Sequence, residues 1–416
     1  MLSVFRNAWK VKEIRQKLYF ILIMLAVYRV GCHIGLPGIN ADAIVNPSEE
    51  NIAILMMIMG GNQGTIFAMG IGPYITASII MQLLTYAIPP LERMQKEGEE
   101  GRKKINQYTR IAAVALAVLQ GSFTVLSLHQ SGSFRHDNMF VWIVAVVSIV
   151  TGTMFIMWLS ELITEKGVGN GSSFIIFANI LSGIPQGVYT LWSVAQPSFL
   201  DALKVIVILI LFVFIIAFTV LIQEGERRLP VQYSAKMVGR QRYGGQTSFI
   251  PVKVNIAGVM SIIFSMSLLG LPQQLSMFFP NNATLQSISS VLSNTHPVGA
   301  ILYVVLIFGF TFFYTSFAVN PVEMAENMKK NGGTIPGVRS GKPTSDYIQR
   351  TVTRLSWIGA VFYSIIALIP VVIQWVTGVS VGVGGTTMLI VVGVALELVN
   401  QLESQLLTRH YKGFLS

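Results

Sequence analysis

Charged residues and cysteines are scarce in this sequence, and both shortages narrow the classes of protein that it can encode. Only 12% of the 416 residues are charged, whereas a soluble domain has about 25%. A chain with so few charges cannot cover a water-exposed surface of its size, which argues against a soluble enzyme. The single cysteine, Cys32, excludes an intrachain disulfide framework and a zinc site built on cysteines. With 52% hydrophobic residues, the composition predicts a polytopic membrane protein.

The sequence also lacks the patterns that carry catalysis, metal binding or ion coupling. It contains no HExxH motif, no phosphate-binding P-loop and no nucleophile elbow, and its five histidines share no helix face. Charges within the long apolar segments are few, and those away from the segment ends or near the inner ends include Arg29, Glu161 and Glu397. None of them forms the midplane carboxylate site that an ion-coupled transporter usually needs. We therefore expect no enzymatic activity, no metal site and no cofactor.

Ten apolar segments are candidates for membrane spans, because a helix that crosses about 30 Å of hydrocarbon needs about 20 apolar residues. The segments are approximately residues 18–36, 66–88, 111–128, 139–163, 173–191, 203–222, 254–278, 298–319, 352–375 and 386–400. Gly183 and Pro185 interrupt the fifth segment, and the tenth is short. The sequence therefore predicts an all-α polytopic membrane protein with ten transmembrane helices.

Basic residues lie in alternate loops, and this pattern predicts the orientation. Of the 29 Lys and Arg residues, only Arg29, Arg135 and Lys204 lie outside the two termini and the loops after the second, fourth, sixth and eighth spans. Loops rich in Lys and Arg stay in the cytoplasm. Both termini are therefore expected in the cytosol.

The chain divides into two predicted halves of five spans, residues 1–191 and residues 192–416. Because five is an odd number, the two halves have opposite orientations, which suits an inverted repeat around a central pathway. The second half has two long cytosolic loops, at about 223–253 and 320–351. Topology alone accounts for their basic charge, but a plain connector would be shorter. A second interpretation is a platform for an acidic partner, either protein or RNA phosphate.

The segment 51–64, between the first two spans, is apolar but too short to cross a membrane. Residues 52–59 are apolar throughout, and eight helical residues reach only about 12 Å. Glycines at 60, 61 and 64 then interrupt the segment. Two interpretations stay open, a short interfacial helix and a re-entrant piece that lies within the protein.

Several stretches of the chain closely resemble the SecY family, whose members form the channel of the bacterial Sec protein translocon. The most specific are IFAMGIGPYITASII at 66–80, KEGEEGRKK at 96–104, GTMFIMWL at 152–159 and GGTT at 384–387. The resemblance extends over essentially the whole chain. It implies a protein-conducting channel in the plasma (inner) membrane that passes unfolded polypeptides and releases signal or transmembrane helices sideways into lipid. The alternative is a ten-helix secondary transporter of a small solute, which fits the topology but lacks a charged site.

The same resemblance implies a role for residues of the pathway. The segment 51–64 would be a mobile plug beneath the pore. Its residues would include Ile52, Leu55, Met56, Met59, Gly60 and Gly61. An aliphatic ring at the narrowest point would consist of Ile71, Ile75, Ile176, Ile263 and Ile390. Ser172 stands at a sixth position that is often isoleucine in relatives, so the ring has five aliphatic members here.

The resemblance further implies a lateral gate and a set of partners. Three uncharged polar residues match the polar cluster of the gate, namely Thr76, Gln120 and Asn255, although such residues also hold helices together in ordinary bundles. Arginines of the two long loops would contact cytosolic partners, namely Arg227, Arg228, Arg240, Arg242 and Arg339. The expected partners are the small membrane subunits SecE and SecG, the motor ATPase SecA, the ribosome, signal peptides and nascent polypeptides, and the lipid bilayer.

Overall fold

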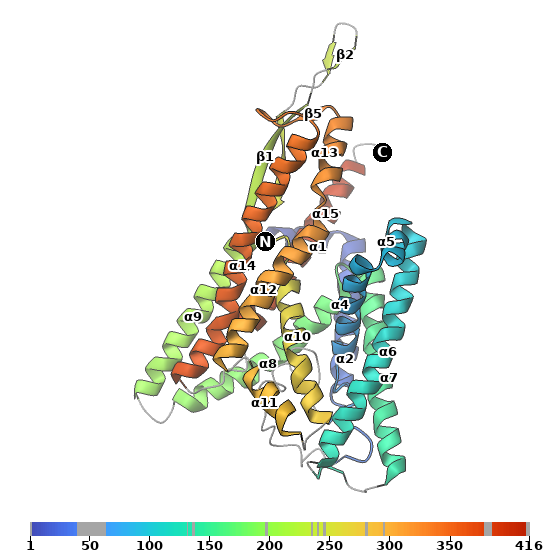
Figure 1. The fold of residues 1–416 in the computed structure, drawn as a ribbon, viewed down its shortest axis with the longest axis vertical. Coiled ribbons are helices and arrows are strands. Elements are labelled where there is room, and N and C mark those ends of the chain that lie inside the picture. The colour runs from blue at the N-terminus through green and yellow to red at the C-terminus, as the bar shows by residue number, and fades with distance from the viewer. Residues whose placement is uncertain are drawn as a thin grey trace.

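The protein is described from a computed structural model, and it is helical over most of its length. The structure describes residues 2–39, 64–130, 132–134, 138–195, 199–233, 236–238, 241–243, 247–278, 282–293, 296–377 and 385–412. Figure 1 shows long helices packed side by side, with strands projecting at one end of the molecule. The predicted plug residues 51–63 lie outside the described part of the chain.

A long helix is present at each of the ten predicted spans. These helices are α2 (Lys12–Gly31), α4 (Gly72–Ala87), α6 (Glu99–Gln130), α7 (Met139–Lys166), α8 (Gly171–Ala195), α9 (Phe199–Glu224), α10 (Met260–Phe278), α12 (Pro297–Ala318), α14 (Lys342–Thr377) and α15 (Gly385–Lys412). Within the described residues, six helices are long and apolar enough to cross a membrane, or seven if α4 and the short α5 (Pro89–Lys96) form one bent span. The helical polytopic fold is confirmed, whereas the count of ten crossings stays a prediction.

Glycine and proline set the helix boundaries that differ from the predicted ones. Helix α4 begins at Gly72 rather than near residue 66, because Gly70 has a φ of +52° that a helix cannot contain and Pro73 favours a helix start. Helix α10 begins at Met260 rather than at 254, after Gly258 with a φ of +62°. Asn255 therefore lies in the connection before α10 and not in the helix.

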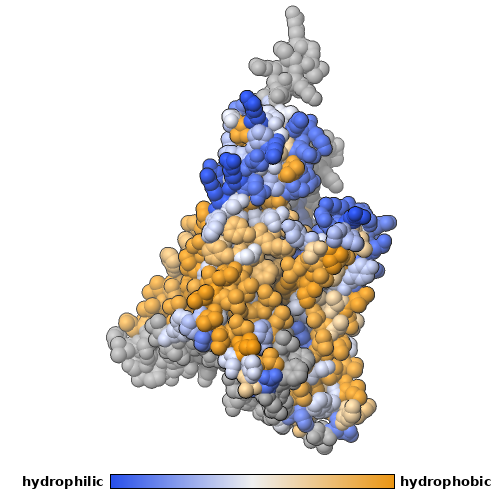
Figure 2. Space-filling view, in the orientation of Figure 1, coloured by the Kyte–Doolittle hydropathy of each residue, from blue (hydrophilic) through white to orange (hydrophobic). Residues whose placement is uncertain are grey.

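The outer surface of the helices is apolar, as a bilayer requires. Helix α9 exposes a row of large apolar side chains, among them Ile206, Ile210, Val213 and Phe214. Figure 2 shows a broad hydrophobic band over the helices, with hydrophilic residues gathered around α5 and the strands. This distribution of apolar and polar residues is that of a multi-pass membrane protein.

The helices pack as two groups that follow chain order. In the N-terminal group α6 packs against both α4 and α7, and α7 also packs against α2 and α8. In the C-terminal group α12 packs against α10 and α14, and α15 packs against α9 and α14. The groups meet where α8 contacts α9 and α15 and where α10 contacts α4 and α6. The predicted boundary at residues 191 and 192 falls within α8.

The two long loops add short strands that the predicted helical fold did not include. Strand β1 (Glu226–Tyr233) pairs with β4 (Thr247–Lys253) and with β5 (Gly333–Thr334) of the other loop, so that the sheet order is β4-β1-β5. Strands β2 (Lys236–Val238) and β3 (Gln241–Tyr243) form a separate hairpin. The three-stranded sheet is stable because apolar residues of β1, β4 and the helix α13 (Pro321–Lys330) pack on α14. The buried members are Leu229, Val231, Val252, Met328, Ile335, Ile348, Val352 and Leu355.

Two further helices lie outside the predicted spans. They are α1 (Leu2–Lys10), which packs against α2 and α15, and α11 (Ala283–Val291), which packs against α10 and α12. The side chain of Asn282 accepts hydrogen bonds from the backbone N–H groups of Thr284 and Leu285 and so begins α11.

Gly152 of α7 allows the turn before α4 to approach closely. A Cβ at this position would overlap the carbonyl oxygen of Ile66, and the Phe67 ring lies 3.1 Å away. We expect Gly152→Ala to lower the free energy of unfolding by about 1–3 kcal/mol, because the backbone must shift. Thermal unfolding of the detergent-solubilised protein measures the effect.

Gly309 of α12 supplies the matched control, since no neighbouring group lies within 4 Å of the position that a Cβ would take there. Gly309→Ala gains up to about 1 kcal/mol of helix propensity without a clash. A midpoint for Gly152→Ala equal to or above that of the parent protein would contradict the close approach.

Candidate pore

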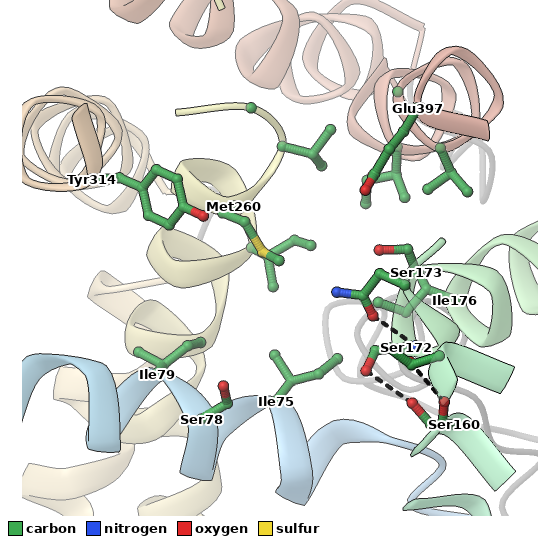
Figure 3. A pocket seen from close by; sticks show the side chains of 18 of the residues that line it. Ile75, Ser78, Ile79, Ser160, Ser172, Ser173, Ile176, Met260, Tyr314 and Glu397 are labelled. Carbon is green, nitrogen blue, oxygen red and sulfur yellow. Dashed lines mark hydrogen bonds between the residues drawn. The ribbon is translucent and has the colours of Figure 1, made fainter. Parts of the chain in front are cut away.

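A cavity of about 1050 Å³ lies between the two groups of helices. Its wall includes residues of α4, α6, α7 and α8 from the N-terminal group and residues of α10, α12 and α15 from the C-terminal group. The connection that leads from β4 into α10 also contributes to the wall. Figure 3 shows side chains from both groups converging on this space.

The predicted ring isoleucines lie together at this cavity. Ile75, Ile176, Ile263 and Ile390 line it, one each from α4, α8, α10 and α15. Ile71 is fully buried at the residue before α4 and does not line the cavity, but it belongs to the same apolar cluster as the other four. The structure thus gathers the five residues from positions up to 319 apart in the chain. The side chains of these five residues are aliphatic and offer no hydrogen-bonding groups of their own.

Ser172, the polar residue at the sixth ring position, is held by neighbours in its own group of helices. Its hydroxyl lies 3.0 Å from the Ser160 hydroxyl of α7, and its backbone N–H donates to Asn170 Oδ1 at 2.9 Å (Figure 3). The adjacent N–H of Gly171 donates to the Thr164 hydroxyl at 2.8 Å. These bonds tie the start of α8 to the end of α7, so the Ser172 hydroxyl already has a protein partner.

The three residues of the predicted gate lie on neighbouring elements, but only one of them reaches the cavity. Asn255 lines it, and its Oδ1 is buried without a hydrogen-bond partner among the described residues. Thr76 of α4 and Gln120 of α6 are half-buried and do not line the cavity. Helix α10, which follows Asn255, packs against both α4 and α6, so the elements that carry or adjoin these residues meet between the groups.

Sequence reasoning missed most of the polar wall of the cavity. Tyr74, Gln223 and Asn400 line it from three different helices, together with several serines and other amides. An ion pair also stands there, since Arg110 Nε of α6 lies 2.7 Å from Glu161 Oε1 of α7. These residues are dispersed along the chain, and no local pattern in the sequence predicts that they share a cavity.

The arginines assigned to cytosolic partners have different environments. Arg227 and Arg339 are exposed, the first on β1 and the second after the turn that follows β5. Arg228 forms an ion pair of 2.7 Å with Glu226 and stacks on the Phe249 ring at 4.8 Å. Arg240 lies outside the described residues, and Arg242 is on β3 with its side chain undescribed.

Comparison of the sequence with known protein families identifies the family of this chain. The SecY family profile matches residues 65–399, which is most of the chain. The chain belongs to the SecY family. SecY, a protein translocase subunit, of Thermus thermophilus is 42% identical over 437 residues, covering 100% of this chain and 98% of that protein. SecY of Bacillus subtilis is 40% identical over 430 residues and covers 100% of both chains.

Solved structures of SecY-like channels share the fold. One described as a protein-conducting channel has a TM-score of 0.66 at 20% identity and covers 95% of this chain and 93% of its own. Sec61 in the canine ribosome–channel complex has a TM-score of 0.63 at 18% identity, with the same coverage. At these identities the likeness establishes the SecY architecture, and the roles of individual residues depend on the geometry described above.

Proposed function

We propose that this chain is the channel-forming subunit of a bacterial protein translocase, which passes unfolded polypeptides across the membrane. The observation that carries the proposal is the cluster of five isoleucines, contributed by both groups of helices, at a large cavity with polar and apolar side chains in its wall. Membership in the SecY family supports a polypeptide channel and not the alternative, a transporter of a small solute. Nothing in the proposed role requires catalysis by the chain itself.

An aliphatic constriction suits this substrate for a physical reason. A passing polypeptide carries charges of both signs, so fixed charges at the narrowest point would hold back some segments. An apolar constriction excludes water and ions by dewetting when it is empty. It also closes around a passing chain without breaking hydrogen bonds of its own.

The seam between the groups is the proposed exit for signal and transmembrane helices. An apolar helix gains about 25 cal/mol for each Å² of apolar surface that moves from water into lipid. The proposed gate residues are the uncharged Thr76, Gln120 and Asn255, and hydrogen bonds between such residues contribute about 0.6–2 kcal/mol each within membranes. Contacts of this strength close a seam and still allow it to open.

The segment 51–64 is the proposed plug, and its attachment supports this role. The two ends of the longer segment that contains it are tied together, since the N–H of Leu36 donates to the Gly64 carbonyl and the N–H of Ile66 donates to the Ile34 carbonyl. The described chain then continues directly to Ile71 of the ring cluster. The described residues that flank the segment are therefore held together a few positions before Ile71.

The proposed surroundings of the chain follow from the positions of its charges. We place the channel in the plasma (inner) membrane with both termini in the cytosol, as two inverted halves around one pore. The partners would be SecE and SecG in the membrane, and SecA or the ribosome on the cytosolic sheet formed by β1, β4 and β5. Among relatives of this fold, Sec61 and Ssh1 occur in complexes with ribosomes.

Reconstitution into liposomes tests the function directly. The chain, purified with its membrane partners and supplied with a motor ATPase, should make a secretory precursor resistant to added protease. Uptake of a small solute driven by an ion gradient, with no protection of the precursor, would refute the proposal.

Charge reversal of the cytosolic sheet should weaken binding of the motor or the ribosome. We expect Arg227→Glu with Arg339→Glu to reduce affinity about tenfold or more, because both arginines are exposed and neither forms an ion pair among the described residues. Co-sedimentation of the motor or the ribosome with vesicles that contain the variant measures this affinity, and protease digestion first checks that the variant is correctly inserted. Lys166→Glu, an exposed change at the end of α7, is the control. Equal affinity of the double variant and the control would contradict the assignment.

A further inference from the structure

The cavity wall differs in charge from the rest of the protein. The chain has a formal net charge of +10. Among the described residues, however, the cavity is lined by three cationic side chains and three carboxylates. The six charged residues of the cavity wall are Lys103, Arg110, Lys253, Glu161, Glu165 and Glu397. A strongly basic protein thus encloses a wall whose charges balance.

On each side of the cavity, the positive charges equal the negative charges in number. Two cations and two carboxylates come from α6 and α7 of the N-terminal group, whereas in the C-terminal half the end of β4 contributes one cation and α15 contributes one carboxylate. Arg110 and Glu161 form the ion pair of 2.7 Å on the first side. On the second side Lys253 and Glu397 line the same cavity, and Glu397 points into it in Figure 3 and accepts a hydrogen bond from Gln401 at 3.3 Å. When the groups separate, neither side acquires a net charge.

We propose that the three carboxylates determine the substrate range of the channel, because they cancel the cationic field of the wall so that basic and acidic segments pass equally well. This inference rests on the proposed function. Charges within about 8 Å act on one another at physiological salt, so the charges of the wall act on a chain that passes close to them. Without the carboxylates, a passing lysine would meet three cations and no compensating charge.

Three matched precursors test the inference in proteoliposomes that contain the full chain with its membrane partners and a motor ATPase. The precursors are identical except for one internal tract of Lys, Glu or Gln. The readout is the rate at which each becomes protease-resistant, divided by the rate of the Gln precursor. For the variant Glu161→Gln, Glu165→Gln, Glu397→Gln we expect the Lys ratio to fall about fivefold at low salt and the Glu ratio not to fall. Added salt should restore the Lys ratio, because it screens the uncancelled charges.

A smaller pair of variants keeps the test decisive if the triple variant fails to insert. Glu397 has no ion pair within 4 Å among the described residues, so Glu397→Gln should lower the Lys ratio by a smaller factor with little disturbance of structure. Adding Lys253→Gln restores the balance of that side and should return the Lys ratio to that of the parent. Unchanged Lys ratios in all variants, or a Lys ratio that the second substitution fails to restore, would overturn the inference. If the parent protein does not move even the Gln precursor, the proposed function itself fails.

Discussion

Replacing Ile75 and Ile263 together by serine should raise the ion conductance of the resting channel about tenfold or more. The two side chains line the cavity from opposite groups of helices and belong to the cluster that would seal it. Serine is smaller than isoleucine and offers a hydroxyl to water, so the constriction would stay wet. Because both residues already border the cavity, the hydroxyls can be hydrated and the fold should persist. Conductance of planar bilayers that contain the purified complex measures the leak.

Valine at the same two positions is the matched control. Ile75→Val with Ile263→Val shortens both side chains but keeps the constriction aliphatic, so we expect little added conductance. A serine variant as tight as the valine variant would show that the five-isoleucine cluster is not the barrier. It would also remove the observation on which the proposed function depends.

The positions of the spans could be predicted from the sequence because lipid imposes a composition on each of them. The ends of the spans could not. Helix α6 begins at Glu99 and α14 at Lys342, and both extend through polar residues that a search for apolar segments omits. Helix α9 shows the opposite case, in which the predicted segment 203–222 and the observed Phe199–Glu224 nearly coincide. Composition predicts where a helix contacts lipid, and tertiary packing determines how far it continues beyond the membrane.

The sheet and the site depend on contacts between distant parts of the chain. The hydroxyl of Thr334 in β5 donates to the carbonyl of Gln232 in β1 across 102 residues, and no local pattern predicts that pairing. Ile71 directly precedes α4 and Ile75 lies in its first turn, and both were assigned to the ring from the resemblance to a family. Ile176 and Ile390 were assigned in the same way. The charge balance of the cavity wall was not predicted, because its six members come from four separate segments.

Fixing α4 to α10 should block polypeptide transport almost completely. Ile79 of α4 and Phe264 of α10 are buried, line the same cavity and belong to one apolar cluster. Cysteines at these two positions, in a Cys32→Ala background, can be joined by a short flexible bismaleimide. The link would hold the N-terminal and C-terminal groups together along the seam. A polypeptide wider than the closed constriction could then neither enter it nor leave sideways.

A second crosslink separates the effect on the seam from any effect of crosslinking itself. Ala77 of α4 and Ala113 of α6 are both buried in one small cluster within the N-terminal group. Cysteines joined there connect two helices that would move together, so transport should continue. Mass spectrometry of the modified chain verifies each link, and protease protection of the precursor measures transport. Full transport through a verified link between α4 and α10 would mean that the groups need not separate, and the pore would have to open by movement within one group instead.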